Sequence, residues 1–143
     1  IGHNYRMSEF QAAVLTVKMK YIKKWTEKRR CNAQKYNERL KDLKNVIIPF
    51  ESPNCKHVYH LYVIRVEKRD KLQSYLDKKG ISTGIHYPFP LHLTGAYKYL
   101  DYNKSDFPVA EKIADEILSL PMYPELIETQ IDYICESIRK FYR

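Results

Sequence analysis

The chain has 143 residues, of which 44% are hydrophobic, and it carries a formal net charge of +8 at pH 7. This length and apolar content predict one domain with a buried core and exclude a largely disordered chain. No apolar run approaches the roughly 20 residues of a membrane-spanning helix, and no secretory pattern opens the sequence.

The three cysteines are scattered along the chain and include no C-x-x-C pair. This spacing predicts neither a zinc site nor a disulfide framework, so we assign no metal ligands. A reducing cytoplasm is the simplest setting for such a chain. The sequence begins at Ile1 rather than at a methionine, which leads us to expect part of a longer protein.

The positive charge is spread over every segment and is densest between Lys18 and Arg30. In and beside that stretch the charges are interspersed with Val17, Ile22 and Trp25, as in an amphipathic helix whose charged side faces solvent. We therefore favour a solvated helix face over a surface that binds nucleic acid or another polyanion.

A long helix is predicted near the N-terminal end. Ser8 and Gln11 have the spacing of a capping box, which marks a helix start. Apolar residues then recur mostly in steps of three and four, at Phe10, Val14, Val17, Tyr21, Trp25, Ala33, Tyr36, Leu40 and Leu43. An unbroken helix over about residues 8–44 would be roughly 50 Å long at ~1.5 Å per residue. We expect such a helix to connect this domain to another one, or to form a dimer contact.

Two strands are predicted next, a short one at Val46–Pro49 and a clear one at His57–Val66. Alternation in the second strand places Val58, His60, Tyr62, Ile64 and Val66 on one face. Because both of its faces are largely apolar, we expect both to be covered. A helix at Arg69–Lys79 and a strand at Ile81–Tyr87 follow, and this strand–helix–strand order predicts a crossover unit.

The C-terminal part is predicted to contain two helices. The first begins near Pro108 and continues to Leu118, and residues 119–124 then form an extended segment. The last helix is expected from about Glu128 to Phe141. The predicted fold class is therefore α+β, a small sheet covered by helices and preceded by the long N-terminal helix.

The segment Thr83–His92 holds the residues best suited to a binding site. Its two prolines fix the backbone into a stiff extended path after Gly84. Such a path can hold His86, Tyr87 and His92 toward a shared space with little conformational entropy left to lose. The alternative is a proline-rich loop whose aromatic side chains cap the core.

Asn4 and Arg6 stand directly before the predicted start of the long helix. A helix N-terminus attracts anions through its free N–H groups and its dipole. An Asn amide and an Arg guanidinium beside it would strengthen a phosphate or carboxylate site. A polar loop leading into the helix is the alternative.

Four blocks of this sequence together resemble the DegT/DnrJ/StrS aminotransferases. Gly2–Ala13 resembles the G-x-N-x-R-M-s-e-x-q-A-A block of that family, and Thr83–His92 its t-G-I-x-x-H-Y-P-x-P-l-H region with one residue of slack. Phe107–Glu111 and Leu118–Pro124 match its f-P-x-A-E and l-S-L-P-m-y-P blocks. The blocks occur in family order and span nearly the whole chain. Members often have threonine where this chain has Ile127, which cannot cap the last helix.

The resemblance implies a pyridoxal-phosphate enzyme of the aspartate-aminotransferase fold that aminates keto sugars on nucleotide carriers, with an amino acid such as glutamate as donor. Residues 1–143 would be its C-terminal small domain with the interdomain helix at about 8–44. The large domain with the Schiff-base lysine would be absent, so we assign no catalytic residue and expect the fragment alone to be inactive.

The resemblance also implies roles for the candidate residues. Asn4 and Arg6 would reach across a homodimer to the cofactor of the partner, near its phosphate. His86, Tyr87 and His92 would lie near the nucleotide-sugar site. Two other functions stay open: a sugar dehydratase of the same family, in which histidine replaces the lysine, and a non-enzymatic module for dimerisation or polyanion binding. The sugar, the nucleotide and the aminated carbon are not specified by this sequence.

Overall fold

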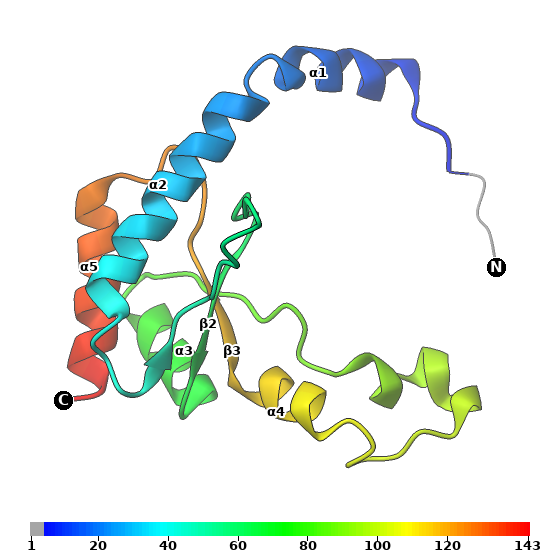
Figure 1. Cartoon of the computed structure of the whole chain (residues 1–143), viewed down its shortest axis with the longest axis vertical. Coiled ribbons are helices and arrows are strands. Elements are labelled where there is room, and N and C mark those ends of the chain that lie inside the picture. Colours follow the sequence, from blue (N-terminus) through cyan, green and yellow to red (C-terminus); the bar gives the residue numbers. More distant parts are fainter. Residues whose placement is uncertain (1–4) are drawn as a thin grey trace.

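A three-stranded antiparallel sheet lies at the centre of the structure, a computed structural model that describes residues 5–143. Its strands are β1 (Val46–Ile47), β2 (Tyr62–Val66) and β3 (Ile117–Leu120), in the order β1–β2–β3. Helices lie around the sheet, as Figure 1 shows, so the predicted α+β class is confirmed. None of the described helices is long and apolar enough to cross a membrane.

The strand predicted at residues 81–87 is reduced to a single bridge, but its direction agrees with the predicted crossover unit, because it runs antiparallel to β3 and therefore parallel to β2. Central strand β2 pairs antiparallel with both neighbours, with Val66 opposite Val46 and Tyr62 opposite Leu120. The segment expected as a strand at residues 81–87 makes one isolated bridge, between Gly84 and Ser119, on the far side of β3. In this register residue 82 would lie opposite Pro121, which lacks an N–H donor, so the pairing does not extend in that direction.

Strand β2 is shorter than the predicted strand at 57–66 because the backbone turns before Tyr62. Tyr59 has a positive φ of 49°, a conformation incompatible with a regular strand. The turn buries Tyr59 and leaves His60 exposed, so the predicted alternation fails there. From Tyr62 onward the alternation holds, with Tyr62, Ile64 and Val66 buried and the intervening residues half-buried.

The predicted single helix over residues 8–44 is instead two helices, α1 (Glu9–Met19) and α2 (Ile22–Leu40), which meet at a bend visible in Figure 1. The capping box of Ser8 and Gln11 is confirmed. At the bend the N–H groups of Lys20 and Tyr21 bond to carbonyls three residues back, a tighter turn than an α-helix. The hydroxyl of Thr16 also bonds to the carbonyl of Ala12, a contact that favours bending.

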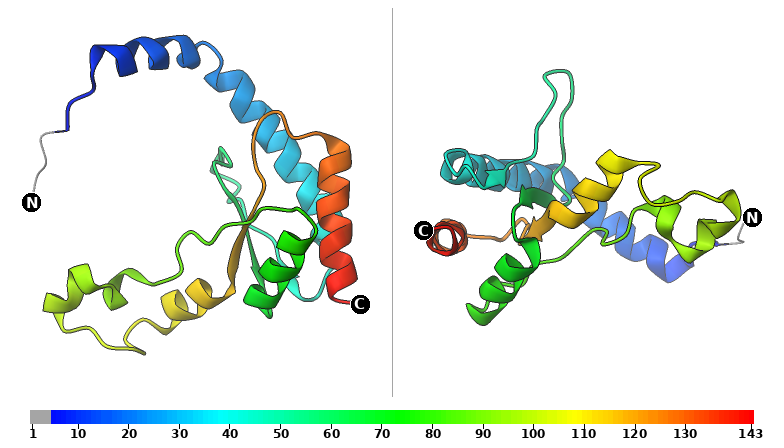
Figure 2. Two further views of the ribbon diagram at one scale, coloured as in Figure 1. Left: turned by 180° about the vertical axis from the view of Figure 1, so that it is seen from behind. Right: turned by 90° about the horizontal axis from the view of Figure 1, so that it is seen from below.

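Helix α1 has no buried residue, although much of it is apolar. Phe10, for example, is 79% exposed. Figure 2 shows that α1 extends away from the sheet, whereas α2 continues alongside it. The described chain therefore leaves an apolar helix uncovered.

The remaining three helices lie where the sequence predicted them, except that α4 ends earlier than expected. Helix α3 is Arg69–Lys78, followed by Gly80 with a φ of +74° as its stop. Helix α4 is Pro108–Glu116, with the proline at its first turn, and it is shorter than predicted because residues 117 and 118 belong to β3. Helix α5 is Glu128–Phe141, as predicted.

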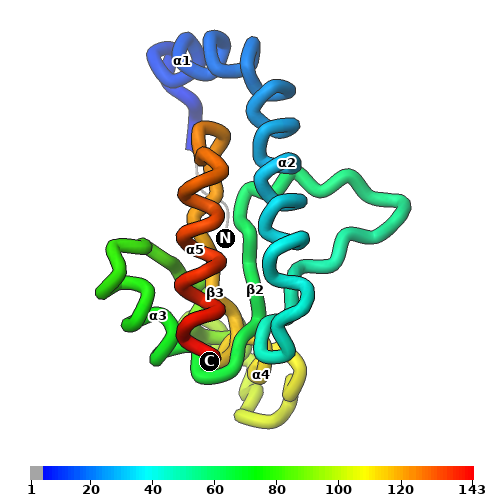
Figure 3. The backbone as a smooth tube through the Cα atoms, turned by 90° about the vertical axis from the view of Figure 1, so that its left-hand side faces the viewer, coloured from blue at the N-terminus to red at the C-terminus, as the bar shows by residue number. Residues whose placement is uncertain are grey.

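One face of the sheet carries the core. Figure 3 shows α2 and α5 side by side, with α3 next to α5. Their apolar side chains form one buried cluster with Tyr62, Ile64 and Val66 of β2. The phenol ring of Tyr62 stacks on that of Tyr36 with 4.7 Å between ring centroids, and burial raises the pKa of both phenols. The opposite face is less covered: Arg65 lies there, paired with Glu116 of α4.

The carboxylate of Glu51 is the centre of the contacts that hold the loop between β1 and β2 against α2, and the ion pair of Lys56 with Glu27 of α2 adds to them. Glu51 Oε1 accepts hydrogen bonds from Arg30 at 2.6 Å and from the backbone N–H of His57 at 2.7 Å. Tyr59 donates its hydroxyl to Glu51 Oε2 at 3.2 Å. The hydrogen bond from Arg30 is the largest cause that lowers the pKa of Glu51, from 4.5 to about 2.

We expect this loop to detach from α2 in acid. A carboxyl with a depressed folded-state pKa stabilises the folded contacts above its unfolded pKa, and protonation removes that stabilisation as the pH falls. For Glu51 the loss should occur between pH 4.5 and about 2. The amide chemical shifts of His57 and Tyr59, followed by NMR through this range, measure it. Glu51→Gln should make the transition smaller and leave the part that comes from Glu27, which pairs with Lys56 of the same loop. An unchanged transition in Glu51→Gln would contradict the assignment.

Candidate functional site

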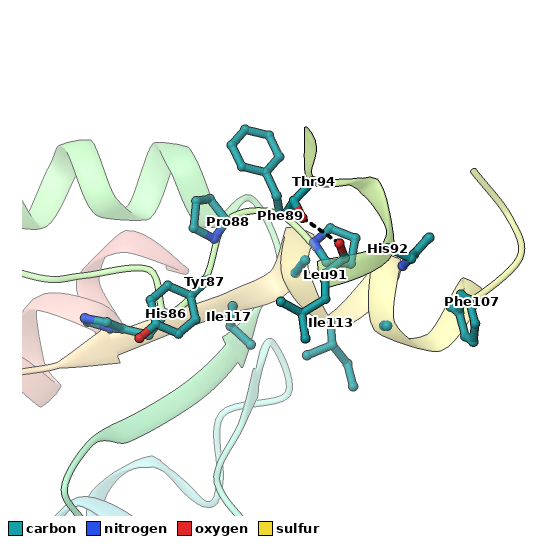
Figure 4. A pocket seen from close by; sticks show the side chains of 13 residues that line it. His86, Tyr87, Pro88, Phe89, Leu91, His92, Thr94, Phe107, Ile113 and Ile117 are labelled. Atoms are coloured by element: carbon teal, nitrogen blue, oxygen red, sulfur yellow. Dashed lines mark hydrogen bonds between the residues drawn. The ribbon is translucent and has the colours of Figure 1, made fainter. Parts of the chain in front are cut away.

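A cavity of about 940 Å³ lies between helix α4 and residues 86–94. We call residues 83–94 the ribbon. Figure 4 shows the cavity with the ribbon on one side and α4 on the other. Its wall is mostly apolar, and its lining includes His86, Tyr87, Phe89, His92, Phe107 and Ile113. The structure thus brings the three predicted substrate-binding residues of the ribbon to one cavity, and their role in binding stays a prediction.

His86 is placed by contacts from β3. Its Nδ1 lies 2.9 Å from the hydroxyl oxygen of Ser119, a buried residue of that strand. The backbone groups of Ser119 are bonded to those of Gly84 at 2.7 and 3.1 Å, which holds the ribbon against the strand. The ring of Tyr87 meets the His86 ring edge-on, and the peptide bond between the two residues is cis.

His92 fastens the other end of the ribbon to α4. Its side chain is 8% exposed, and its Nε2 lies 3.0 Å from Oε1 of Glu111. The same carboxylate oxygen accepts the backbone N–H of Ser105 at 2.8 Å. Burial opposes the ionisation of Glu111, but the N–H of Ser105 and the His92 ring outweigh it and hold the pKa of Glu111 below its ordinary value. Phe107 packs against the His92 ring.

Between these two anchors the ribbon is open. Tyr87 is 74% exposed, and Phe89 and Leu91 are also exposed. A proline-rich loop that only capped the core would bury these aromatic side chains. The ribbon therefore presents an apolar and aromatic surface rather than completing the core of this domain.

Arg6 lies two residues before the N-cap of α1 and is exposed. Within residues 5–143 its guanidinium has no hydrogen bond or ion pair, and it is not among the residues that line the cavity. A free guanidinium beside the start of an 11-residue helix fits contact with a phosphate. It provides one contact, not an enclosed site for a whole cofactor. Asn4, predicted to act with it, lies outside the described residues.

The sequence analysis missed Ser119 and Glu111, which orient the two histidines. Both residues lie inside blocks that carry the family resemblance, at 118–124 and 107–111. That signal marked their segments, but their partners lie 33 and 19 positions away along the chain. Among residues 5–143, no group of three His, Cys, Asp or Glu side chains is placed to hold a metal ion.

Replacing Glu111 by alanine should release the ribbon from α4. The change removes the acceptor for both His92 and the N–H of Ser105. Hydrogen exchange at residue 105 and at the amides of 91–94 should become faster, because these groups would open more often. Glu111→Gln keeps an amide oxygen as acceptor and should have the smaller effect. Equal exchange in wild type and Glu111→Ala would show that this carboxylate does not hold the ribbon.

Comparison with known proteins identifies the family. The model of the DegT/DnrJ/EryC1/StrS aminotransferase family matches residues 1–139. A protein named pleiotropic regulatory protein from Geobacillus stearothermophilus is 46% identical over 100% of this chain and 39% of its own length. The dTDP-3-amino-3,4,6-trideoxy-alpha-D-glucose transaminase of Streptomyces venezuelae is 36% identical over 98% of this chain and 38% of its own length.

The solved structures agree with the sequence matches. The crystal structure of DesV from S. venezuelae superimposes with a TM-score of 0.93 and 36% identity, covering 98% of this chain and 38% of that one. The chain thus spans less than two fifths of the length of the relatives it matches. A match over 139 of 143 residues and a shared fold together establish that this chain belongs to the DegT/DnrJ/EryC1/StrS aminotransferase family.

Proposed function

We propose that the chain is the C-terminal small domain of a pyridoxal-phosphate-dependent aminotransferase that transfers an amino group to a nucleotide-linked keto sugar. The observation that carries this proposal is the match to sugar transaminases over nearly the whole chain but only about 38% of their length. A dTDP-amino-sugar transaminase from Aneurinibacillus thermoaerophilus matches in the same way. The donor would be an amino acid such as glutamate, and the setting the cytoplasm.

Uncovered apolar surface supports a domain that works with another part of the protein. Helix α1 buries no residue, and the ribbon exposes Tyr87, Phe89 and Leu91. Isolated domains rarely expose apolar surface on this scale without a partner for it. In the proposal, a large cofactor-binding domain covers these surfaces, α1 and α2 form the connection between domains, and the 143-residue chain alone is inactive.

Pyridoxal phosphate, when bound, supplies the electron sink that allows an amino group to move between an amino acid and a keto sugar. This chain would contribute to its binding through Arg6 and Asn4, which contact the phosphate. The guanidinium of Arg6 has no competing partner within residues 5–143, which supports this role. If these residues serve the neighbouring subunit, the complete protein must be a homodimer or a multiple of one.

The ribbon would form one wall of the nucleotide-sugar site. Tyr87 offers an aromatic surface, and His86 offers a ring nitrogen for hydrogen bonding with sugar or phosphate oxygens. His92 lies at the far end of the same cavity, where Glu111 holds it. Anchoring at both ends keeps the segment stiff, which lowers the entropy lost when a ligand binds.

Amino transfer by the complete protein tests the proposal directly. Purified protein is given pyridoxal phosphate, glutamate and a nucleotide-linked keto sugar, and the amino-sugar product is followed by mass spectrometry. We expect product only when both cofactor and donor are present, and none from residues 1–143 alone. A product that has lost a sugar hydroxyl, formed without consumption of the amino donor glutamate, would instead identify a dehydratase. A complete protein that never binds pyridoxal phosphate would overturn both enzymatic functions and leave a dimerisation or polyanion-binding module.

A further inference from the structure

The hydroxyl of Ser119 forms a hydrogen bond with the ring of His86. Ser119 is 4% exposed, and within residues 5–143 its hydroxyl has one hydrogen-bond partner, Nδ1 of His86 at 2.9 Å. The backbone N–H and carbonyl of Ser119 are both used by Gly84. The serine therefore cannot move without breaking the bridge that holds the ribbon on β3.

Burial decides which atom donates in this hydrogen bond. A neutral imidazole has one N–H donor and one bare acceptor nitrogen. If Nδ1 carried the hydrogen, the Ser119 proton would have no acceptor among the described residues, a costly state for a buried hydroxyl. If Ser119 donates, both groups are satisfied and the ring hydrogen is on Nε2. Within the described residues Nε2 has no hydrogen-bond partner, so it remains available.

Gly84 supplies the space that the ring occupies. A Cβ atom added at residue 84 would lie 2.7 Å from Cε1 of His86, closer than real Cβ contacts come. No such restriction applies at Gly95, where nothing lies within 4 Å of the added atom. The φ of Gly84 is not in the positive region, so an alanine there would meet the His86 ring rather than a backbone barrier.

We propose that Ser119 and Gly84 are positioning residues that hold His86 in its Nε2–H tautomer and direct this N–H toward an oxygen acceptor of the substrate. The serine fixes the tautomer by donating to Nδ1, and the glycine leaves the space beside the backbone that the Cε1 edge of the ring occupies. The ligand group would be a sugar hydroxyl or a phosphate oxygen, because both accept a hydrogen bond. The substrate part of this inference rests on the function proposed above, whereas the tautomer does not.

Nitrogen-15 NMR of the complete protein, with ring-labelled histidine and no substrate, tests the tautomer. Spectra are recorded about two pH units above the ordinary imidazole pKa of about 6.5, and His86→Gln assigns the signals. We expect Nε2 to be protonated and Nδ1 to have the shift of a nitrogen that accepts a hydrogen bond. In Ser119→Ala, Nδ1 should shift to the position of a solvated ring. A protonated Nδ1 in the wild type, or unchanged shifts in Ser119→Ala, would overturn the proposal.

Matched variants separate positioning from folding. Ser119→Thr keeps the hydroxyl and should preserve the Nδ1 shift. Gly84→Ala also keeps the hydroxyl but should change the shift as Ser119→Ala does, because the added methyl displaces the ring. Gly95→Ala is the control and should leave the spectrum unchanged. A wild-type spectrum from Gly84→Ala would show that the ring does not need this space.

Kinetics of the complete protein test the substrate part. Loss of one oriented donor should raise the KM for the nucleotide sugar roughly 3- to 10-fold in Ser119→Ala, with kcat little changed. In a protein that already carries His86→Ala, adding Ser119→Ala should have no further effect, because the serine acts through the ring. An additive second loss would contradict positioning. If no amino transfer is detected at all, the proposed function fails, but the NMR result stands independently.

Discussion

Replacing Arg6 by alanine in the complete protein should weaken the binding of pyridoxal phosphate about 10- to 100-fold, because hydrogen bonds to charged groups contribute about 1.5–3 kcal/mol each. The guanidinium is free within residues 5–143, so its removal breaks no contact in the described domain. Titration of the cofactor-free protein with pyridoxal phosphate, followed by the visible absorbance of the bound cofactor, measures the change. Arg6→Lys should bind with intermediate affinity, since lysine keeps the charge but not the planar fork.

Lys18→Ala is the control for Arg6. Lys18 is an exposed cation in the last turn of the same helix, and its loss should leave cofactor affinity unchanged.

Mixed dimers test whether Arg6 acts across subunits. One subunit carries Arg6→Ala and the other lacks the cofactor-binding lysine, so a dimer regains a complete site only if Arg6 serves the neighbour. Recovered activity in the mixture supports that arrangement, and no recovery assigns Arg6 to its own subunit. An unchanged affinity for pyridoxal phosphate in Arg6→Ala would show that Arg6 does not contact the cofactor.

Replacing Tyr62 by alanine should destabilise the domain by about 3–5 kcal/mol, the range observed when large aromatic side chains are removed from protein cores. Tyr62 is fully buried in the central strand, opposite Leu120 of β3 and stacked on Tyr36 of α2. Its hydroxyl donates to the side-chain oxygen of Asn37 at 2.6 Å. One side chain thus joins β2 to both a strand and a helix. Urea unfolding of the chain, followed by circular dichroism, gives the free energy of unfolding.

Two further variants separate the ring from its hydroxyl. Tyr62→Phe keeps the ring and should cost about 1–3 kcal/mol, because the oxygen of Asn37 loses its donor in a partly buried place. Tyr99→Ala removes the same atoms at a position that is 75% exposed and should stay within about 0.5 kcal/mol of wild type. A Tyr62→Ala protein as stable as Tyr99→Ala would show that the Tyr36–Tyr62 stack does not support the core.

Part of the site was predictable from the sequence, and the rest depended on distant partners. The two prolines and the histidines of the ribbon identified the segment that lines the cavity. They did not identify Ser119, because its hydroxyl becomes relevant only after Gly84 pairs with β3. The sequence analysis did not assign Ile113 to the site, because only the fold places this side of α4 against the ribbon.

The sequence by itself determined the features that depend on near neighbours in the chain: the capped start of α1, the limits of α5 and the blocks that place the chain in its family. Periodicity and capping involve residues three or four positions apart, so the pattern alone is sufficient for them. Tertiary structure decided the antiparallel pairing of β2 with β3 and the orientation of His86 and His92. Those features depend on which distant residue lies opposite, and packing rather than local preference selects that partner.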